Sequence, residues 1–267
     1  MTKSILNYIS RSMQRHSFLN GYEPRLSWLF FLAWLLICVM ENDNRKVVTF
    51  YIDGFNFYYG IKRSILADKK WGNAYWIDLV KLCEGFIGPD EILAKVIYFT
   101  ATPLSIGKSA RQSVFLNANK ALNKDRFEIV RGKYLEKQYE CPSCKTKISR
   151  PEEKKTDVNI SVRMIRDCIH RTTDSITLIS ADTDLLPPLE LIKSDFPEIK
   201  LKVIFPPSNY SHDVASTLQS WKSKVVLMKN NYKRFENAVM PDNVSTAEGK
   251  IYSIPAEWKE KQCFQKF

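Results

Sequence analysis

Nearly continuous apolar runs alternate with amphipathic stretches from residue 47 to about residue 230 of this 267-residue chain. Such runs are typical of strands buried on both faces of a parallel sheet. They predict strands at 47–52, 93–100, 127–130, 176–179, 201–205 and 225–228. Between the runs, apolar residues recur at helical spacing, as in the series Val158, Val162, Ile165 and Ile169. The pattern predicts helices at 55–65, 77–86, 111–122, 157–169, 185–193 and 211–220.

This alternation of strand and helix predicts an α/β fold: an open parallel sheet with helices on both faces and right-handed crossovers. The domain is expected to span residues 46–230, with a small hairpin insert at 133–150 that contains two cysteines. Residues 231–267 lack clear periodicity and predict a loosely attached tail, and residues 1–45 form an N-terminal extension.

The extension contains an unbroken apolar run at residues 28–40, which is 13 residues long. A membrane-spanning helix needs about 20 apolar residues. Three explanations remain for this segment: a mis-assigned start with Met40 as the true first residue, a hydrophobic membrane anchor at residues 26–40, or a signal peptide. We favour the first, in which residues 1–39 do not belong to the native protein, because the first strand begins seven residues after Met40. A cytoplasmic location follows from that explanation.

The chain is basic, with 40 Lys and Arg residues against 29 Asp and Glu residues and a formal net charge of +11. Residues 131–155 alone carry eight basic and four acidic side chains. A basic surface attracts polyanions such as nucleic acid, although a surplus of lysine also serves solubility alone. Six irregularly spaced cysteines do not form a disulfide scaffold in a chain of this length, so reduced thiols are expected.

Four aspartates stand where predicted strands end or a helix begins: Asp53, Asp157, Asp182 and Asp184. The carboxyl ends of parallel strands meet at one edge of a sheet, so we expect these carboxylates to converge. Clustered carboxylates favour a hard cation such as Mg²⁺ or Mn²⁺. The plain alternative is helix capping, and of the last two aspartates this role suits Asp184 better. The sequence therefore predicts an acidic metal site.

Three strings resemble the NYN domain, the LabA-like branch of the PIN-type nucleases: Tyr-Ile-Asp-Gly-Phe-Asn at 51–56, Lys-Lys-Thr-Asp-Val-Asn-Ile at 154–160 and Ser-Ala-Asp-Thr-Asp-Leu at 180–185. The resemblance covers roughly residues 46–230. It implies a PIN-like fold and metal-dependent ribonuclease activity. It also implies that Asp53, Asp157, Asp182 and Asp184 form the catalytic, metal-binding set.

Further residues near these strings are candidates for binding substrate. Asn56 can donate its amide to a ligand carboxylate or a phosphate, or it caps a helix. Lys154, Lys155 and Arg111 can neutralise phosphates, although solvated charges explain them nearly as well. Tyr58 can stack on a base, as aromatic residues of single-strand binders do.

Cys141 and Cys144 have the spacing of a zinc knuckle. A structural zinc site needs four ligands, and the sequence supplies two locally. Three explanations stay open: a Zn²⁺ shared across a homodimer, a redox-active pair, or a hairpin without metal.

The leading hypothesis is a Mg²⁺- or Mn²⁺-dependent endoribonuclease of the PIN type that hydrolyses phosphodiester bonds in single-stranded RNA. The first alternative is a nucleic-acid-binding or regulatory module whose acidic site is vestigial or serves another ligand. The second is a membrane-tethered protein, if residues 26–40 are a genuine anchor. Neither the RNA target nor the oligomeric state follows from the sequence.

Overall fold

The computed structural model describes residues 45–263, without the side chains of residues 135–137, 148–153 and 260–263. Its centre is a sheet of six strands, all parallel, in the order β3-β2-β1-β6-β7-β8. The strands are β1 (Lys46–Asp53), β2 (Glu91–Thr100), β3 (Phe127–Arg131), β6 (Ser175–Ile179), β7 (Lys200–Phe205) and β8 (Lys224–Leu227). The predicted open parallel sheet is confirmed, with β1 at its centre.

The chain reverses its direction of travel across the sheet at β1. From β1 it moves outward to β2 and β3, and it then returns to the other side of β1 to form β6, β7 and β8. In doubly wound sheets, ligands bind outside the carboxyl ends of the strands at such a switch point. Here the switch point lies between β1 and β6, which are hydrogen-bonded neighbours from the pair Val48–Ser175 to the pair Ile52–Ile179.

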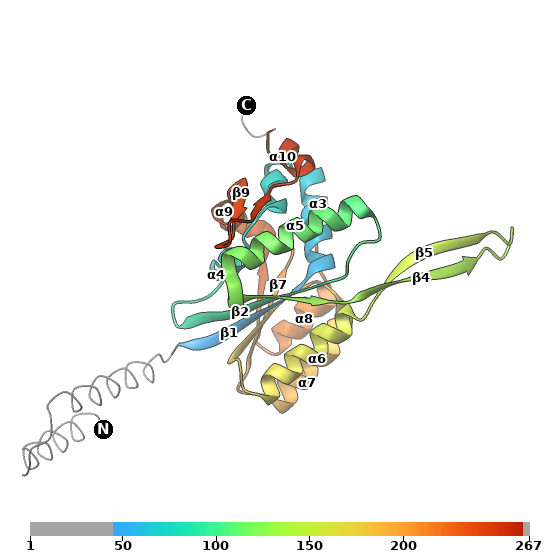
Figure 1. Cartoon of the computed structure of the whole chain (residues 1–267). Coiled ribbons are helices and arrows are strands. Elements are labelled where there is room, and N and C mark those ends of the chain that lie inside the picture. Colours follow the sequence, from blue (N-terminus) through green and yellow to red (C-terminus); the bar gives the residue numbers. More distant parts are fainter. Residues whose placement is uncertain (1–44, 264–267) are drawn as a thin grey trace, which may run out of the picture. The chain divides into compact units, whose positions relative to one another are not determined.

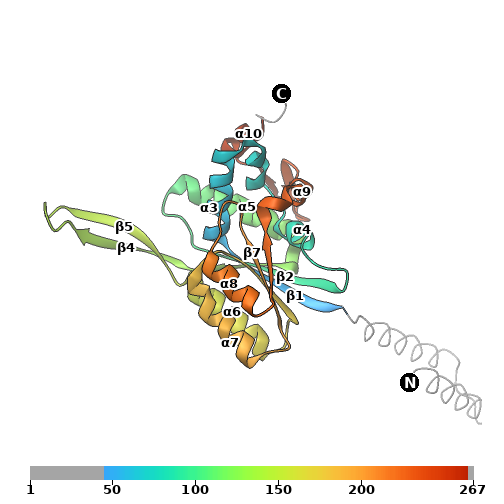
Figure 2. The ribbon, with the colours of Figure 1, turned by 180° about the vertical axis from the view of Figure 1, so that it is seen from behind.

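Helices cover both faces of the sheet, as predicted (Figures 1 and 2). One face is covered by α3 (Gly54–Ala67), η1 (Lys69–Tyr75), α4 (Leu79–Glu84) and α5 (Ile106–Asn123), followed by the short η2 (Lys124–Arg126). The other is covered by α6 (Thr156–Ile169), α7 (Leu186–Asp195) and α8 (His212–Ser220), with η3 (Thr183–Leu185) leading into α7.

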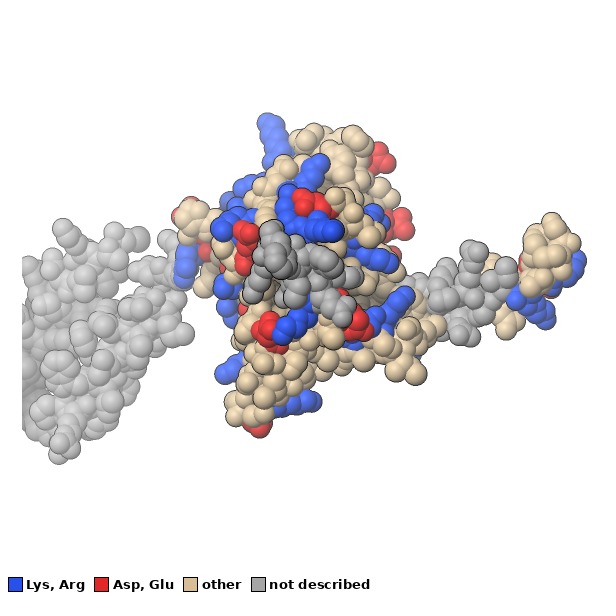
Figure 3. Space-filling view, turned by 90° about the horizontal axis from the view of Figure 1, so that it is seen from above, with Lys and Arg blue, Asp and Glu red and all other residues tan. Residues whose placement is uncertain are grey.

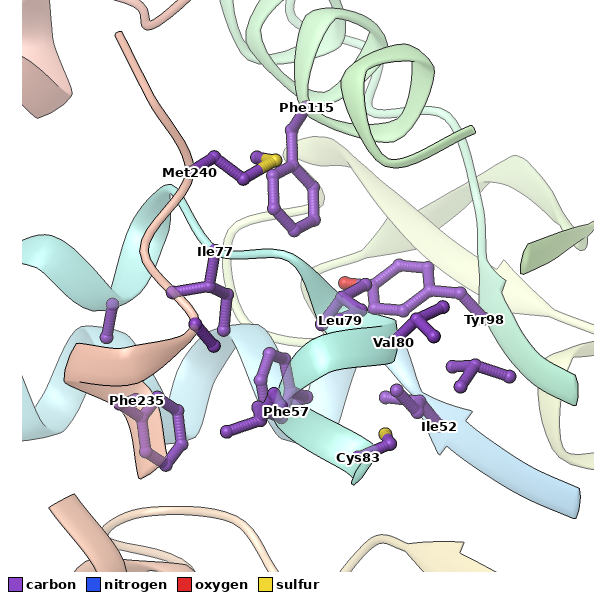
Figure 4. Close-up of a cluster of buried hydrophobic side chains, with 14 of the residues drawn as sticks. Ile52, Phe57, Ile77, Leu79, Val80, Cys83, Tyr98, Phe115, Phe235 and Met240 are labelled. Carbon is purple, nitrogen blue, oxygen red and sulfur yellow. The ribbon is translucent and has the colours of Figure 1, made fainter. Parts of the chain in front are cut away.

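Alternate side chains of the central strand belong to different cores. Val48, Phe50 and Ile52 pack into the core beneath α3, α4 and α5 (Figure 4), whereas Tyr51 packs into the core beneath α6, α7 and α8. Because side chains alternate between the two faces of a strand, β1 needs apolar side chains at both odd and even positions to serve both cores. This double burial explains the continuous apolar run in the sequence.

The C-terminal segment is not the loosely attached tail that its sequence predicts. It forms η4 (Met228–Asn231), α9 (Tyr232–Asn237), a hairpin of β9 (Asn243–Ser245) and β10 (Ile251–Ser253), and α10 (Ala256–Cys263). Phe235, Met240 and Trp258 are buried, and the first two point into the cluster that contains Phe57 and Phe115 (Figure 4). The prediction was wrong because single anchoring residues on irregular structure leave no periodic signal.

The cysteine-containing insert is a long hairpin of β4 (Lys133–Glu140) and β5 (Lys147–Lys154), which extends four residues beyond the predicted boundary at 150. It forms its own two-stranded sheet and projects from the body of the domain (Figure 1). At its base, the ring of Tyr134 meets that of Phe55 edge to face, with centroids 5.9 Å apart. The hairpin is therefore fixed to the domain beside the carboxyl end of β1.

The hydrophobic segment at residues 26–40 lies outside the residues that the structure describes. Among the residues that it does describe, no helix has the length and apolar character needed to cross a membrane.

A charged network holds α6 against the sheet. Arg163 donates two hydrogen bonds to Glu128 on β3, at 2.5 and 3.0 Å, and its Nε donates to Asp167 at 2.9 Å. The hydroxyl of Tyr51 on β1 donates to the same Asp167 carboxylate at 2.8 Å. These bonds join three elements at one point and set the position of α6, whose first turn contains Asp157.

Replacing Arg163 with methionine should lower the free energy of unfolding by about 3 kcal/mol, since two partly buried carboxylates lose their counter-charge. Urea denaturation measures this loss, and Arg166→Met, at an exposed position of the same helix, should change the free energy of unfolding by less than about 0.5 kcal/mol.

The stability of the wild-type protein should also depend on pH, because the hydrogen bonds from Arg163 lower the pKa of Glu128 below its usual 4.5. The stabilisation is therefore present above that pH and lost as the pH falls through the lower, folded-state pKa. A wild-type protein that keeps its stability under such acid conditions would contradict this account.

Candidate metal centre

Asp53 is the last residue of β1 and also the N-cap of α3. Its Oδ1 accepts hydrogen bonds from the backbone N–H groups of Phe55 and Asn56, at 3.1 and 3.0 Å. The residue is 3% exposed. Gly54 allows the tight turn that follows, because a Cβ at this position would lie 2.5 Å from the carbonyl oxygen of Phe99 on β2. The strand end thus presents a buried carboxylate in a fixed orientation.

Ser180 connects Asp53 to the loop after β6. Its buried hydroxyl donates to Asp53 Oδ2 at 2.8 Å and accepts from the backbone N–H of Asp182 at 3.1 Å. Asp182 in turn caps η3, since its Oδ1 accepts from the backbone N–H of Asp184 at 3.0 Å. One hydroxyl therefore sets the spacing between two of the predicted ligands.

Asp157 reaches the same edge of the sheet from α6, the helix that carries the chain across the switch point to β6. It is the second residue of that helix and is half-buried. The helix begins after Lys155, which adopts a left-handed conformation with φ of 78°. The helix N-terminus favours a negative side chain in its first turn, which suits a carboxylate at this position.

The structure brings Asp53, Asp157 and Asp182 together, with one carboxylate oxygen of each lying within 4.8 Å of the others. Oxygens on opposite sides of a Mg²⁺ ion lie about 4.2 Å apart, twice the metal–oxygen distance of about 2.1 Å. Small side-chain movements would therefore bring the three oxygens to coordination distance. The donor set is all carboxylate, which fits a hard divalent cation such as Mg²⁺ or Mn²⁺.

The electrostatics of Asp53 also suit a cation. Burial raises the pKa of its carboxyl above the ordinary value, and the charge of Asp182 adds to the rise. Hydrogen bonds from Asn56 and Ser180 oppose it. A carboxylate in this position is costly to keep charged, and a bound cation would offset that cost.

Asp184 does not belong to this group. Its side chain is exposed, and among the described residues the acidic group with close ligand atoms comprises the other three aspartates. The expectation that Asp184 caps the following helix is also wrong, because the capping carboxylate is that of Asp182. Both residues follow the same strand, and the 3₁₀ turn between them directs one inward and leaves the other in solvent.

Asn56 connects Asp53 to two other segments of the chain. Its side chain hydrogen-bonds to Asp53, and its Oδ1 accepts from the backbone N–H of Ala181 at 3.3 Å and from Asn209 at 2.8 Å. It thus donates to a ligand carboxylate, one of the three roles that the sequence leaves open for it. Lys154 and Lys155 are exposed at the start of α6, two or three residues before Asp157.

Beside the carboxylates lies a cavity of about 410 Å³, bordered by Gly54 and Phe55, the residues that follow Asp53. The predicted binding residues Tyr58 and Arg111 both line it. Arg111 also forms an ion pair with Glu257 on α10, at 2.7 Å. Nine of the 20 residues that line the cavity are aromatic: Phe55, Phe57, Tyr58, Tyr59, Tyr75, Tyr98, Phe115, Tyr134 and Trp258.

Cys141 and Cys144 lie in the turn of the β4–β5 hairpin. The Cys144 thiol lies 3.2 Å from the Thr146 hydroxyl, and this hydrogen bond, together with others from the Thr146 backbone and from Cys141, lowers the pKa of Cys144 to about 7. Within the described part of the chain, the pair does not belong to a group of three or more metal-ligating side chains. Zinc binding by this pair stays a prediction that needs ligands from elsewhere, such as a second copy of the chain.

Several residues of the site escape sequence reasoning. Ser180 could have been found, because it opens the string that contains Asp182. Asn209, which holds Asn56, and the distant aromatic residues Tyr75, Tyr98 and Trp258 give no local signal. They come from separate elements that meet when the domain folds.

No known protein-family model matches the chain. A curated relative, 6-hydroxy-3-succinoylpyridine 3-monooxygenase HspA of Pseudomonas putida, is 27% identical over 202 residues, which cover 63% of this chain and 62% of that protein. The chain therefore spans less than two thirds of this relative's length. A crystal structure of a protein of unknown function from Vibrio parahaemolyticus aligns over 74% of this chain and 99% of its own, with 14% identity and a TM-score of 0.47.

Titration with Mn²⁺ should raise the melting temperature of the wild-type protein, because a ligand that binds the folded state alone stabilises it. The gain is about 2.7 kcal/mol at a hundred times Kd. Asp182→Asn and Asp157→Asn should largely abolish this shift, since each removes a charged ligand. Asp184→Asn is the matched control and should retain it. An equal loss in all three variants would count against the three-residue site.

Proposed function

We propose that the protein is a metal-dependent ribonuclease that hydrolyses phosphodiester bonds in single-stranded RNA. The observation that carries the proposal is the convergence of Asp53, Asp157 and Asp182 at the switch point of the sheet. The resemblance of the three strings around these aspartates to the NYN domain supports the choice of RNA as substrate.

In the proposed reaction, a water molecule adds to the phosphorus atom and the bond from phosphorus to the leaving oxygen breaks. The water gives up a proton, and the leaving oxygen gains one. A divalent ion held by the three carboxylates would lower the pKa of the attacking water and stabilise charge on the phosphate. Ser180 and Asn56 keep Asp53 in place throughout, so the ligand set need not reorganise during the reaction.

The distribution of positive charge supports a polyanionic substrate. Lys154 and Lys155 are exposed beside Asp157, and Lys145 and Lys147 are exposed near the tip of the hairpin. Figure 3 shows basic side chains at the hairpin tip and over the face seen from above. Lys154 and Lys155 would bind phosphates next to the cleaved bond, and the lysines near the hairpin tip would bind phosphates further along the strand and collect RNA from solution.

Asp53→Asn should lower the rate of RNA cleavage in Mg²⁺ by about a thousandfold, because a lost metal ligand removes several kcal/mol of transition-state stabilisation. Asp184→Asn should stay within about threefold of wild type. A gel assay with a labelled single-stranded oligoribonucleotide, with and without Mg²⁺, measures both. If the Asp53→Asn protein cleaves at the wild-type rate, cleavage does not depend on the acidic site and the proposal fails; if the wild-type protein binds RNA without cleaving it, the alternative of a binding module replaces the proposal.

RNA affinity should fall steeply with salt. Replacing Lys154 and Lys155 together with alanine should reduce the slope of log K against log salt by about 1.4, since each contact to single-stranded RNA contributes about 0.7. Binding is best measured in the Asp53→Asn protein, which leaves the RNA intact. Lys222 and Lys224, at the amino end of β8 on the opposite edge of the sheet, provide the control pair. An unchanged slope would show that the first pair does not touch phosphate.

A second candidate function is oxygenation of a small aromatic ring. The relative HspA is named for oxygenation of a pyridine, and the aromatic cavity beside the carboxylates has a volume suited to a small molecule. Such a reaction would need molecular oxygen and an added reductant. Oxygen uptake with a hydroxypyridine and reduced nicotinamide, in the absence of RNA cleavage, would favour this second function.

A further inference from the structure

The aromatic cavity is formed by two helices and closed by the C-terminal segment. α3 contributes Tyr58 and Lys62, which lie one turn apart, and α5 contributes Lys108 and Arg111, also one turn apart. At the back, the ring of Tyr75 stacks on that of Trp258, with centroids 5.4 Å apart and an interplanar angle of 16°. The cavity is thus walled by helices on both sides and by a stacked aromatic pair.

Tyr58 presents its ring at this cavity. It is 37% exposed, and it meets Tyr59 edge to face with centroids 5.4 Å apart and Tyr75 in a tilted arrangement at 5.7 Å. These neighbours limit the rotation of the ring, so little freedom is lost when a ligand stacks on it. A partly exposed, held ring is the kind of surface on which single-strand binders stack bases.

The charge of the lining complements an anion. Its three charged residues, Lys62, Lys108 and Arg111, are all basic, and none of the lining residues is acidic. Arg111 is paired with Glu257, but the two lysines are exposed. A flat aromatic interior with cations at its sides matches a nucleotide, which combines a planar base with a phosphate.

The cavity lies next to the acidic site in the chain, although the three aspartates themselves do not line it. Gly54 and Phe55, which follow Asp53 directly, line it, and the hydroxyl of Tyr98 on β2, another lining residue, donates to the carbonyl oxygen of Gly54 at 3.3 Å. An RNA strand whose phosphate lies at the carboxylates therefore has a neighbouring base next to the cavity. A base inside a duplex is stacked and paired, and it cannot enter without being extruded.

We propose that this cavity binds one unpaired base of the RNA, next to the phosphate that is cleaved, and that stacking on Tyr58 restricts the protein to single strands. This inference rests on the proposed ribonuclease function. It adds a base-binding subsite and a physical reason for rejecting duplex RNA.

Binding should be measured with the full-length Asp53→Asn protein and two ligands of equal length: a single-stranded oligoribonucleotide and an abasic ribose-phosphate oligomer. Tyr58→Ala should weaken binding of the first about tenfold and leave binding of the second unchanged, because a lost stacking platform affects bases alone. Tyr58→Phe keeps the ring and should bind as Tyr58 does. Tyr252→Ala, on β10 outside the cavity, controls for loss of a tyrosine elsewhere.

A direct signal comes from an oligoribonucleotide that carries 2-aminopurine. Its fluorescence should be quenched on binding, through stacking, and the quench should disappear in Tyr58→Ala. A duplex of the same sequence should bind at least about tenfold more weakly than the single strand. Equal effects of Tyr58→Ala on base-bearing and abasic oligomers, or no effect on either, would overturn the proposal.

Cleavage assays separate this inference from the function on which it rests. If a Tyr58→Ala protein that keeps Asp53 cleaves single strands with an unchanged KM, the ribonuclease assignment stands and the base subsite fails. If the wild-type protein neither binds nor cleaves RNA, both fail. Tyr58-dependent binding of a hydroxypyridine without any dependence on bases in RNA would assign the cavity to a small molecule instead.

Discussion

A carboxylate buried at the carboxyl end of the central strand is the constraint on which the rest of the site depends. Moving an ionised carboxylate out of water is costly unless hydrogen bonds or a counter-charge compensate. Asp53 receives hydrogen bonds from the first turn of α3 and from Ser180. Each of these donors fixes an element: the direction in which α3 leaves β1, and the loop that leads from β6 to Asp182. The hydrogen bonds of this one side chain therefore help to fix the positions of α3 and of the loop that contains Asp182.

The fold could be predicted from the sequence wherever burial leaves a regular pattern of apolar residues, either a continuous run in a strand or a helical repeat. A strand such as β1, which serves two cores, leaves an apolar run, and the aspartates stand immediately after such runs. Asp182 and Asp184 could not be separated in this way, because both follow β6 and a single 3₁₀ turn decides which one faces inward. The choice is made by backbone geometry, and residue type does not report it.

The segment after β8 escaped prediction for a different reason. Its contributions are single large residues, of which Trp258 is the clearest, and they lie far in sequence from their partners Tyr75 and Phe115. Contacts of this kind follow from the folded shape of the domain and leave no repeat in the chain. The cavity could not be predicted from the sequence for the same reason, since α3, α5 and α10 each supply part of its wall. A boundary drawn at residue 230 would separate the cavity from its back wall.

The β4–β5 hairpin is joined to the domain at its base, where Tyr134 meets Phe55, and it pairs with no strand of the main sheet. Each strand has eight residues, which corresponds to roughly 27 Å at about 3.4 Å per residue. Because the ladder is self-contained, residue pairs could be added or deleted at the turn without moving the carboxylates. The length of the hairpin can therefore change independently of the acidic site. Homologous domains are free to have longer or shorter hairpins while the three aspartates keep their positions.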